Sequence, residues 1–206
     1  GQLTALGENQ EGRIAWAERA DIDFRRLTPQ APGERERLGL QRARFRGKVD
    51  GQAQDARLTG EVIDAEFFDA RSSRPLIRRL VMEREPNEPA TASSERSGQL
   101  EADRIEVRFE LDDDGQSSLP SRLTADGMVR GEGQDAAFEA DQLDALLTAT
   151  LDGTRLRTEV QQAELTGSAA LRGVDAQGAR VRASGHRVLI KPIEQYVELE
   201  ARSGQT

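Results

Sequence analysis

The residues that could do chemistry are few and scattered. His186 is the only histidine and the chain has no cysteine, so neither a His/Cys zinc site nor a thiolate nucleophile can be assembled. The run Asp112–Asp114 lacks the alternating spacing and distal glutamate of a calcium loop, and Gly115 behind it favours a hairpin turn. No pair of carboxylates stands out as an acid–base dyad. We therefore predict that the protein is not an enzyme and holds neither a metal ion nor a cofactor.

The composition indicates a thin structure with much surface. Of the 206 residues 36% are hydrophobic and 32% are charged, and the net charge is -8. The basic residues are almost all arginines scattered among acids, which is typical of a solvated face and argues against a nucleic-acid partner. No apolar run approaches the length of a membrane span. The single tryptophan, Trp16, is interpreted as a packing residue near one end of the fold.

Four segments of the chain share one pattern. They are LTGEVIDAEF from Leu58, LEADRIEVRF from Leu100, FEADQLDALL from Phe138 and VRASGHRVLI from Val181. The first position is apolar, the third is glycine or alanine, and the sixth, eighth and tenth are mostly apolar. The starts are 42, 38 and 43 residues apart. In this alignment His186 takes the position of Ile63, Ile105 and Leu143, so we interpret it as a packed or rim histidine without chemistry.

A second motif, with a glycine near its end, lies between these segments. It reads ARFRGKV from Ala43, LTADGMV from Leu123 and AELTGSA from Ala163. Gly127 and Gly167 are 40 residues apart, and Gly47 precedes Gly127 by two such periods. A period of about 40 residues indicates repeated supersecondary units that must stack to bury their apolar sides.

Alternation with a period of two predicts strands in these units. It is clearest over Ile105–Phe109, where apolar and charged residues alternate. Leu100 and Ala102 have the opposite parity, and the same switch recurs in the other three segments. A switch at one place in each unit predicts a bulge or corner, for which Gly60 and Gly185 are suited.

Turn residues divide the chain further. Proline-containing stretches predict loops at Thr28–Gly39 and Glu85–Gly98, and Asp112–Gly115 and Asp152–Gly153 predict tight turns. Each unit is expected to supply two to four short strands. We expect one domain over 1–206, in which 40–206 is the repeat region and 1–39 forms an N-terminal cap or extra strands.

Stacked units would turn their apolar residues toward one interior. The side chains predicted to line it are Ile63, Phe67, Leu100, Ile105, Val107, Phe109, Leu123, Val129, Phe138, Leu143, Leu147, Val181, Val188 and Ile190. Small residues are expected between them at Gly60, Ala65, Ala102, Ala125, Ala140, Ala145 and Ala183. Two interpretations remain open: a trough wide enough for acyl chains, or an ordinary core in which the side chains meet.

The segments LEADRIEVRF, RLTADGMVRGEG, FEADQLDALL and ARVRASGHRVLI, in this order, resemble the OstA-like β-jelly-roll family. That family includes the periplasmic lipopolysaccharide transport proteins LptA and LptC and the N-terminal domain of LptD. The resemblance is good over Gly98–Gly204, fainter over Leu40–Glu83 and poor before Gly39. Long insertions at Pro86–Gly98 and Leu111–Arg122 depart from the family pattern, so the resemblance does not single out one component.

The resemblance implies an open, V-shaped β-jelly roll of antiparallel strands. It also implies a periplasmic module that shelters the acyl chains of lipopolysaccharide, or of another acylated lipid, on the apolar residues named above. Exposed strand edges would pair with other OstA-like domains into a bridge across the envelope. The chain starts at Gly1, which indicates a piece whose targeting or anchoring segment lies outside this sequence. The alternatives are a phospholipid-bridging trough and a structural stacked-β spacer with a filled core.

Overall fold

The computed structural model describes residues 1–7, 10–27, 37–53, 56–69, 75–94, 98–134, 136–152, 155–174, 178, 180–192 and 196–200. These residues lie mostly in β-strands, and none of them is in an α-helix. The prediction of an all-β protein is therefore confirmed.

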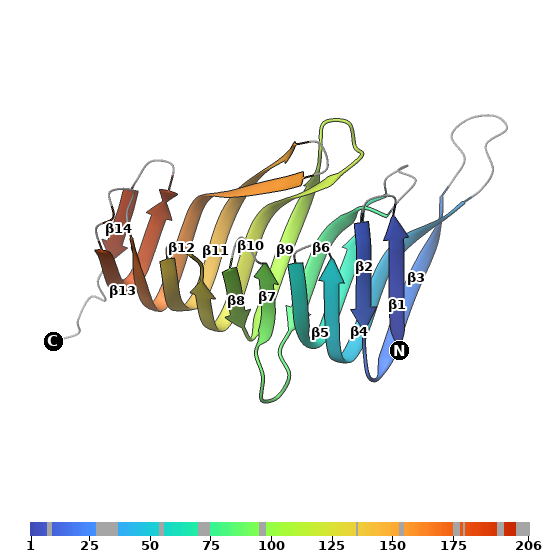
Figure 1. The fold of residues 1–206 in the computed structure, drawn as a ribbon, viewed down its shortest axis with the longest axis horizontal. Helices are drawn as coiled ribbons and strands as arrows, with labels where there is room; N and C mark the ends of the chain where they lie inside the picture. The colour runs from blue at the N-terminus through green and yellow to red at the C-terminus, as the bar shows by residue number, and fades with distance from the viewer. Residues whose placement is uncertain are drawn as a thin grey trace.

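Fourteen strands form one antiparallel sheet over the described residues. In chain order they are β1 (Gln2–Gly7), β2 (Gln10–Ala15), β3 (Arg19–Leu27), β4 (Arg37–Ala53), β5 (Ala56–Phe67), β6 (Ile77–Glu83), β7 (Ala90–Ser94), β8 (Gly98–Ala102), β9 (Arg104–Leu111), β10 (Ser118–Glu132), β11 (Ala136–Asp152), β12 (Arg155–Val174), β13 (Arg180–Lys191) and β14 (Tyr196–Glu200). Figure 1 shows them side by side along the long axis, from the blue N-terminal end to the red C-terminal end.

The sheet folds into two facing layers because its long strands bend (Figure 1). The first layer holds β3, β6, β9 and β14 with residues 37–46, 62–67, 118–126, 142–152, 155–166 and 187–191 of the long strands. The second layer holds β1, β2, β7 and β8 with residues 49–53, 56–60, 129–132, 136–140, 169–174 and 180–185.

Six strands in the middle of the sheet form a closed ring of hydrogen-bonded neighbours. In the first layer β6 and β9 connect β5 to β10, and in the second layer β7 and β8 connect the same two strands. The ring closes because β5 and β10 pass through the bend and belong to both layers. This part of the sheet is therefore a barrel, and the remaining strands continue on either side of it.

The bends use one local structure that recurs with the sequence period. Gly127 and Met128 have positive φ values of 75° and 47°, and the register of β10 with β11 shifts within Asp126–Val129. Gly47 and Gly167 have φ values of 79° and 92° at register shifts in β4 and β12. Glycine adopts this conformation without a steric penalty, and an extra residue on one strand bends the ladder. The predicted corner is thus a β-bulge, but its glycines are Gly47, Gly127 and Gly167 of the second motif. The prediction of Gly60 and Gly185 as the bend glycines is wrong, because these two pair in register with Val49 and Ala169 and do not have positive φ.

An acidic residue of the adjacent strand covers each of two bulges. The Asp103 carboxylate lies where a Cβ on Gly127 would project, and the backbone N–H of Asp103 donates to the Gly127 carbonyl oxygen at 2.9 Å. Asp141 has the same place over Gly167 and accepts a hydrogen bond from the backbone N–H of Ser168 at 3.1 Å. Both acids are the fourth residue of the first sequence motif. The two motifs are therefore two halves of one corner, contributed by neighbouring strands.

Inward-facing side chains form continuous rows across the sheet. The first-layer row is Ala20, Phe45, Ile63, Met82, Ile105, Ala125, Leu143, Leu165, Val188 and Leu199, each opposite the next. The second-layer row is Leu3, Ile14, Gly51, Leu58, Ala92, Leu100, Gly131, Phe138, Leu171 and Ala183. Most members of both rows belong to one apolar cluster, so a single core lies between the layers.

Two expectations about local structure are wrong. The stretch Glu85–Gly98 was predicted as a loop, but it contains β7, whose alternating Ala90 and Ala92 face the core and whose backbone pairs with β5 and β8. The strands are also not all short, since β12 has 20 residues. A bulge bends a strand without ending its ladder, so one strand serves both layers.

The alignment of the fourth repeat segment is wrong by two residues. Val188, and not His186, pairs with Leu165 and continues the first-layer row. Gly185 therefore corresponds to Ala140, and His186 occupies the corner position that Asp141 fills in the preceding unit. Sequence could not fix this register, because small residues stand at both possible third positions of the motif in β13.

Other turn predictions have separate outcomes. The turn at Asp112–Gly115 is confirmed by a hydrogen bond from the Gly115 N–H to the Asp112 carbonyl oxygen at 2.9 Å. Within 28–39, residues 37–39 begin β4, whereas 28–36 lie outside the described residues, as does the Gly153 position of the other predicted turn. The residues before Gly39 supply β1, β2, β3 and the start of β4, which extend both layers.

Candidate functional site

The facing sides of the two layers are the most extended apolar surface of the described chain. Neither the first-layer row nor the second-layer row contains a polar side chain. A third row lies one step farther from the corner in the first layer and is equally apolar: Ile22, Ala43, Ala65, Leu80, Val107, Leu123, Ala145, Ala163, Ile190 and Val197. Three uncharged rows make this face a candidate site for an apolar ligand.

Thirteen of the fourteen residues predicted to line the interior are brought together in one cluster. Five are buried there: Ile63, Ile105, Val129, Leu143 and Val188. Eight are partly buried against them: Phe67, Leu100, Val107, Phe109, Leu123, Phe138, Leu147 and Ile190. Val181 is half-buried but lies outside the cluster, because the corrected register places it farther from the corner. All seven small positions, from Gly60 to Ala183, are buried.

Burial of the inner face decreases with distance from the corner. Along β11, Leu143 is 5% exposed, whereas Leu151 on the same face is 46% exposed. Along β12, exposure rises from 0% at Leu165 to 43% at Leu156. The layers are therefore closely packed at the corner, and apolar side chains remain accessible near their free margins.

The same face is also exposed at the two ends of the array. At the N-terminal end Ile22, Phe24 and Leu38 are exposed on β3 and β4, and at the C-terminal end Val197 and Leu199 are exposed on β14. Within the described part of the chain, β3 and β14 each pair on one side only. Large apolar side chains at free sheet ends indicate surfaces that a ligand or another sheet can cover.

The outer side of the first layer has a different chemistry, centred on Glu106. This buried carboxylate accepts hydrogen bonds from Arg79 Nε at 2.9 Å and Nη2 at 2.8 Å, from Arg104 at 2.8 Å and from Arg108 at 3.0 Å. The hydrogen bonds, that from Arg79 above all, lower the pKa of Glu106 to about 2 although burial opposes this. Because its side-chain hydrogen-bond partners among the described residues are arginines, which hold the charged form, Glu106 acts as a structural anion between β6 and β9.

Further ion pairs cross neighbouring strands on the same side. They join Arg42 to Asp64, Arg78 to Glu66, Arg122 to Asp144 and Arg187 to Glu164. Hydrogen bonding to Asp144 raises the pKa of Arg122, and hydrogen bonding to Glu164 raises that of Arg187. These arginines thus link neighbouring strands through ion pairs on the outer side of the sheet, and they point away from the apolar face.

Two residues singled out by type have packing or surface positions. Trp16 stacks at a tilt on Phe45 with ring centroids 5.1 Å apart, and its backbone N–H donates to the Gly1 carbonyl oxygen at 3.0 Å. The interpretation of Trp16 as a packing residue near one end is confirmed. His186 is exposed at the corner of β13. No group of three His, Asp or Glu residues in the described chain could hold a metal ion.

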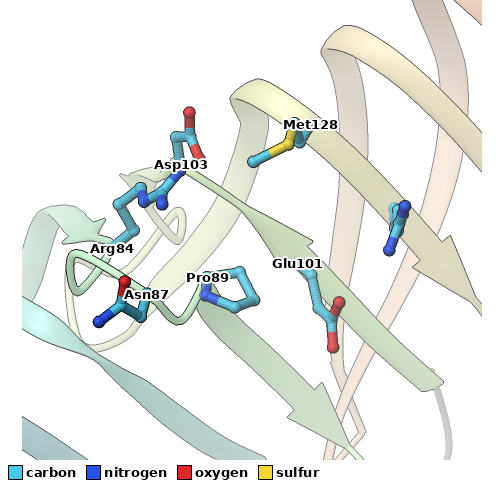
Figure 2. A pocket seen from close by; sticks show the side chains of 7 residues that line it. Arg84, Asn87, Pro89, Glu101, Asp103 and Met128 are labelled. Atoms are coloured by element: carbon cyan, nitrogen blue, oxygen red, sulfur yellow. Dashed lines mark hydrogen bonds and ion pairs between the residues drawn. The ribbon is translucent and has the colours of Figure 1, made fainter.

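A small pocket of about 180 Å³ lies beside the corner (Figure 2). It is lined by Arg84, Asn87, Pro89, Glu101, Asp103, Met128 and Arg130. The Arg84 guanidinium donates to Asp103 Oδ1 at 2.7 Å and to the carbonyl oxygens of Glu85 and Pro86 at 3.0 and 2.9 Å. Arg84 therefore holds the segment between β6 and β7 against the corner, and its cation is already engaged.

Sequence reasoning missed several residues of the inner face. Phe45, Met82 and Leu165 are among its most buried members, and none was predicted. A signal existed for Phe45 and Leu165, which both stand two residues before the glycine of the second motif, as Ala125 does. Met82 lacked such a marker, because the unit that contains β6 has no motif glycine.

No protein-family model matches the chain, and no curated protein is significantly similar to it. Among the described residues, no helix is long and apolar enough to cross a membrane.

Proposed function

We propose that this protein is a periplasmic module that shelters the acyl chains of lipopolysaccharide between its two layers. In this proposal the fold is an OstA-like jelly roll whose layers are open at their margins. The observation that carries the proposal is the exposure of large apolar residues on the inner face, exemplified by Leu151 and Leu156, while the outer face is charged. Burying about six methylenes of an acyl chain there would contribute about 5 kcal/mol.

The two free ends of the array support the second part of the proposal, which is edge-to-edge assembly with other OstA-like domains. Phe24 and Leu38 at one end and Leu199 at the other are apolar and exposed beside β3 and β14, which pair on one side only among the described strands. Pairing of β14 with β3 of another domain would cover them and extend the first-layer row across the junction. An acyl chain could then pass between domains without entering water.

Photocrosslinking tests lipid binding with a matched pair of positions. Leu151 and Leu146 lie on β11 with similar exposures of 46% and 41%, but Leu151 faces inward and Leu146 outward. A benzophenone amino acid at Leu151 should yield lipopolysaccharide adducts in living cells, and the same group at Leu146 should not. Leu143, which is 5% exposed at the closed corner, should give fewer adducts than Leu151.

The alternatives correspond to other outcomes of this experiment. Adducts at Leu151 with phospholipid alone would replace the proposal by a phospholipid bridge. Equal lipid adducts at Leu151 and Leu146 would mean nonspecific labelling and would contradict an inner binding face. Assembly is tested separately by analytical ultracentrifugation, in which a chain that stays monomeric at its highest soluble concentration would oppose self-pairing.

A structural spacer is the second candidate, because part of the interior is filled. Met82, Ile105 and Leu165 are 0% exposed, and near the corner they leave the core inaccessible to solvent. A spacer would need no ligand, and the exposed margin would then be covered by a neighbouring protein. Photocrosslinking at Leu151 that yields protein adducts and no lipid adduct would favour this function.

A further inference from the structure

Three arginines on the outer side of the second layer differ from those of the first layer. Arg172 on β12 lies directly opposite Arg182 on β13, and Arg180 is opposite Val174 at the end of the same hairpin. All three arginines are exposed, and none of them forms an ion pair within the described part of the chain. Side chains alternate between the two faces of a strand, and Leu171, which is next to Arg172, packs on the core. The guanidinium groups therefore project outward.

We define Arg172, Arg180 and Arg182 as the cationic patch, and the described residues around it offer no free counter-charge. The cross-strand neighbour of Arg172 on β11 is Ala137, and next to it Glu139 is already paired with Arg130 at 3.7 Å. Like charges directly opposite each other on a sheet are destabilising. Many first-layer arginines are paired with acids, so three neighbouring arginines without an ion pair among the described residues indicate a surface that meets an external anion.

We propose that the cationic patch docks on the phosphate headgroups of a lipid bilayer. Three guanidinium groups on the flat face of a two-stranded ladder match a plane of phosphates, which guanidinium binds with paired hydrogen bonds. Val174 is 49% exposed on the same side, and an apolar side chain among cations suits the boundary between headgroups and acyl chains. The protein as a whole is acidic, so attraction to an anionic membrane requires a local cluster of cations such as this patch.

The inference goes beyond lipid carriage and does not require it, because the binding test uses vesicles without lipopolysaccharide. Each basic residue near an anionic membrane adds to the attraction. Three such residues together should raise the affinity for the membrane roughly 100-fold. The gain should fall steeply with salt, since exposed charges are screened over about 8 Å at physiological ionic strength.

Co-sedimentation of the full chain with vesicles tests the proposal. The protein should bind phosphatidylcholine vesicles that contain about one-third phosphatidylglycerol and should not bind pure phosphatidylcholine. The triple variant R172Q/R180Q/R182Q should lose roughly 100-fold in affinity, whereas R172K/R180K/R182K should keep most of it. The control R57Q/R122Q/R157Q removes the same charge from arginines that are paired with acids away from the patch, and it should bind nearly as the parent does.

Several results would overturn this inference. They are absence of binding to the anionic vesicles, equal losses in the glutamine variant and its control, and equally tight binding to soluble polyglutamate, which would point to an acidic protein partner. Far-ultraviolet circular dichroism and the melting temperature of the glutamine variant must match the parent, which is expected for exposed side chains. If the variant unfolds, the lysine variant and the salt dependence of the parent decide the question.

Discussion

Replacing Glu106 by glutamine tests whether the outer ion pairs hold the first layer together. The substitution keeps the shape of the side chain but removes the charge that binds Arg79, Arg104 and Arg108. A carboxylate whose pKa is about 2 when folded, against about 4.5 when unfolded, contributes about 3 kcal/mol to stability near neutral pH. The arginines are a third or more exposed, so solvent screens part of this, and we expect a loss of about 1–3 kcal/mol.

The stability difference between the parent and Glu106→Gln should change with pH in a definite direction. The folded-state pKa of Glu106 is depressed, so its contribution is fully present above the unfolded pKa and is lost as pH falls through the folded value of about 2. The glutamine variant lacks that contribution at every pH. The difference in unfolding free energy between parent and Glu106→Gln should therefore be largest near neutral pH and shrink below about pH 4.5.

Urea unfolding followed by circular dichroism at several pH values measures this difference. Asp144→Asn is the matched control, because Asp144 pairs with Arg122 alone and is more exposed, so its loss should be below about 1 kcal/mol. A difference for Glu106→Gln that stays constant from about pH 7 to about pH 3 would refute the electrostatic account. A loss no greater than that of the control would refute the central role given to Glu106.

Three further substitutions probe the corner and the inner face. Gly127→Ala should cost about 1–2 kcal/mol more than Gly115→Ala, since both glycines have positive φ but only Gly127 faces another residue, Asp103; equal melting temperatures would contradict the corner model. Leu165→Ala should cost about 2–5 kcal/mol in urea unfolding because Leu165 is fully buried, and a loss below 1 kcal/mol would show, by the same rule, a looser core. Val107→Asp should destabilise the fold by roughly 2–4 kcal/mol or abolish ligand binding, because it places an unpaired charge on the inner face. Normal stability with normal binding would mean that Val107 faces outward.

The sequence predicted which residues face inward better than it predicted which strands lie side by side. Alternation around Ile105 and Leu143 placed both on the inner side, where they are buried. Pairing across strands was not predictable, because the contacts of Met82 with Ile63 and Ile105 depend on register between segments far apart in the chain. The misplacement of His186 has the same origin, since small residues at two positions allowed two registers.

The sequence by itself determined that this chain is all β, that its units recur about every 40 residues and that the apolar parity switches at one place in each repeated segment. These properties are local, because alternation and positive φ depend on neighbouring residues. Only the tertiary structure decided that Asp103 covers Gly127, that the middle strands close into a ring, and that Glu106 neutralises three arginines. It also decided that Arg172 and Arg182 face each other without an ion pair among the described residues. Those features depend on which strands meet and in which register, and that is settled by packing over the whole sheet.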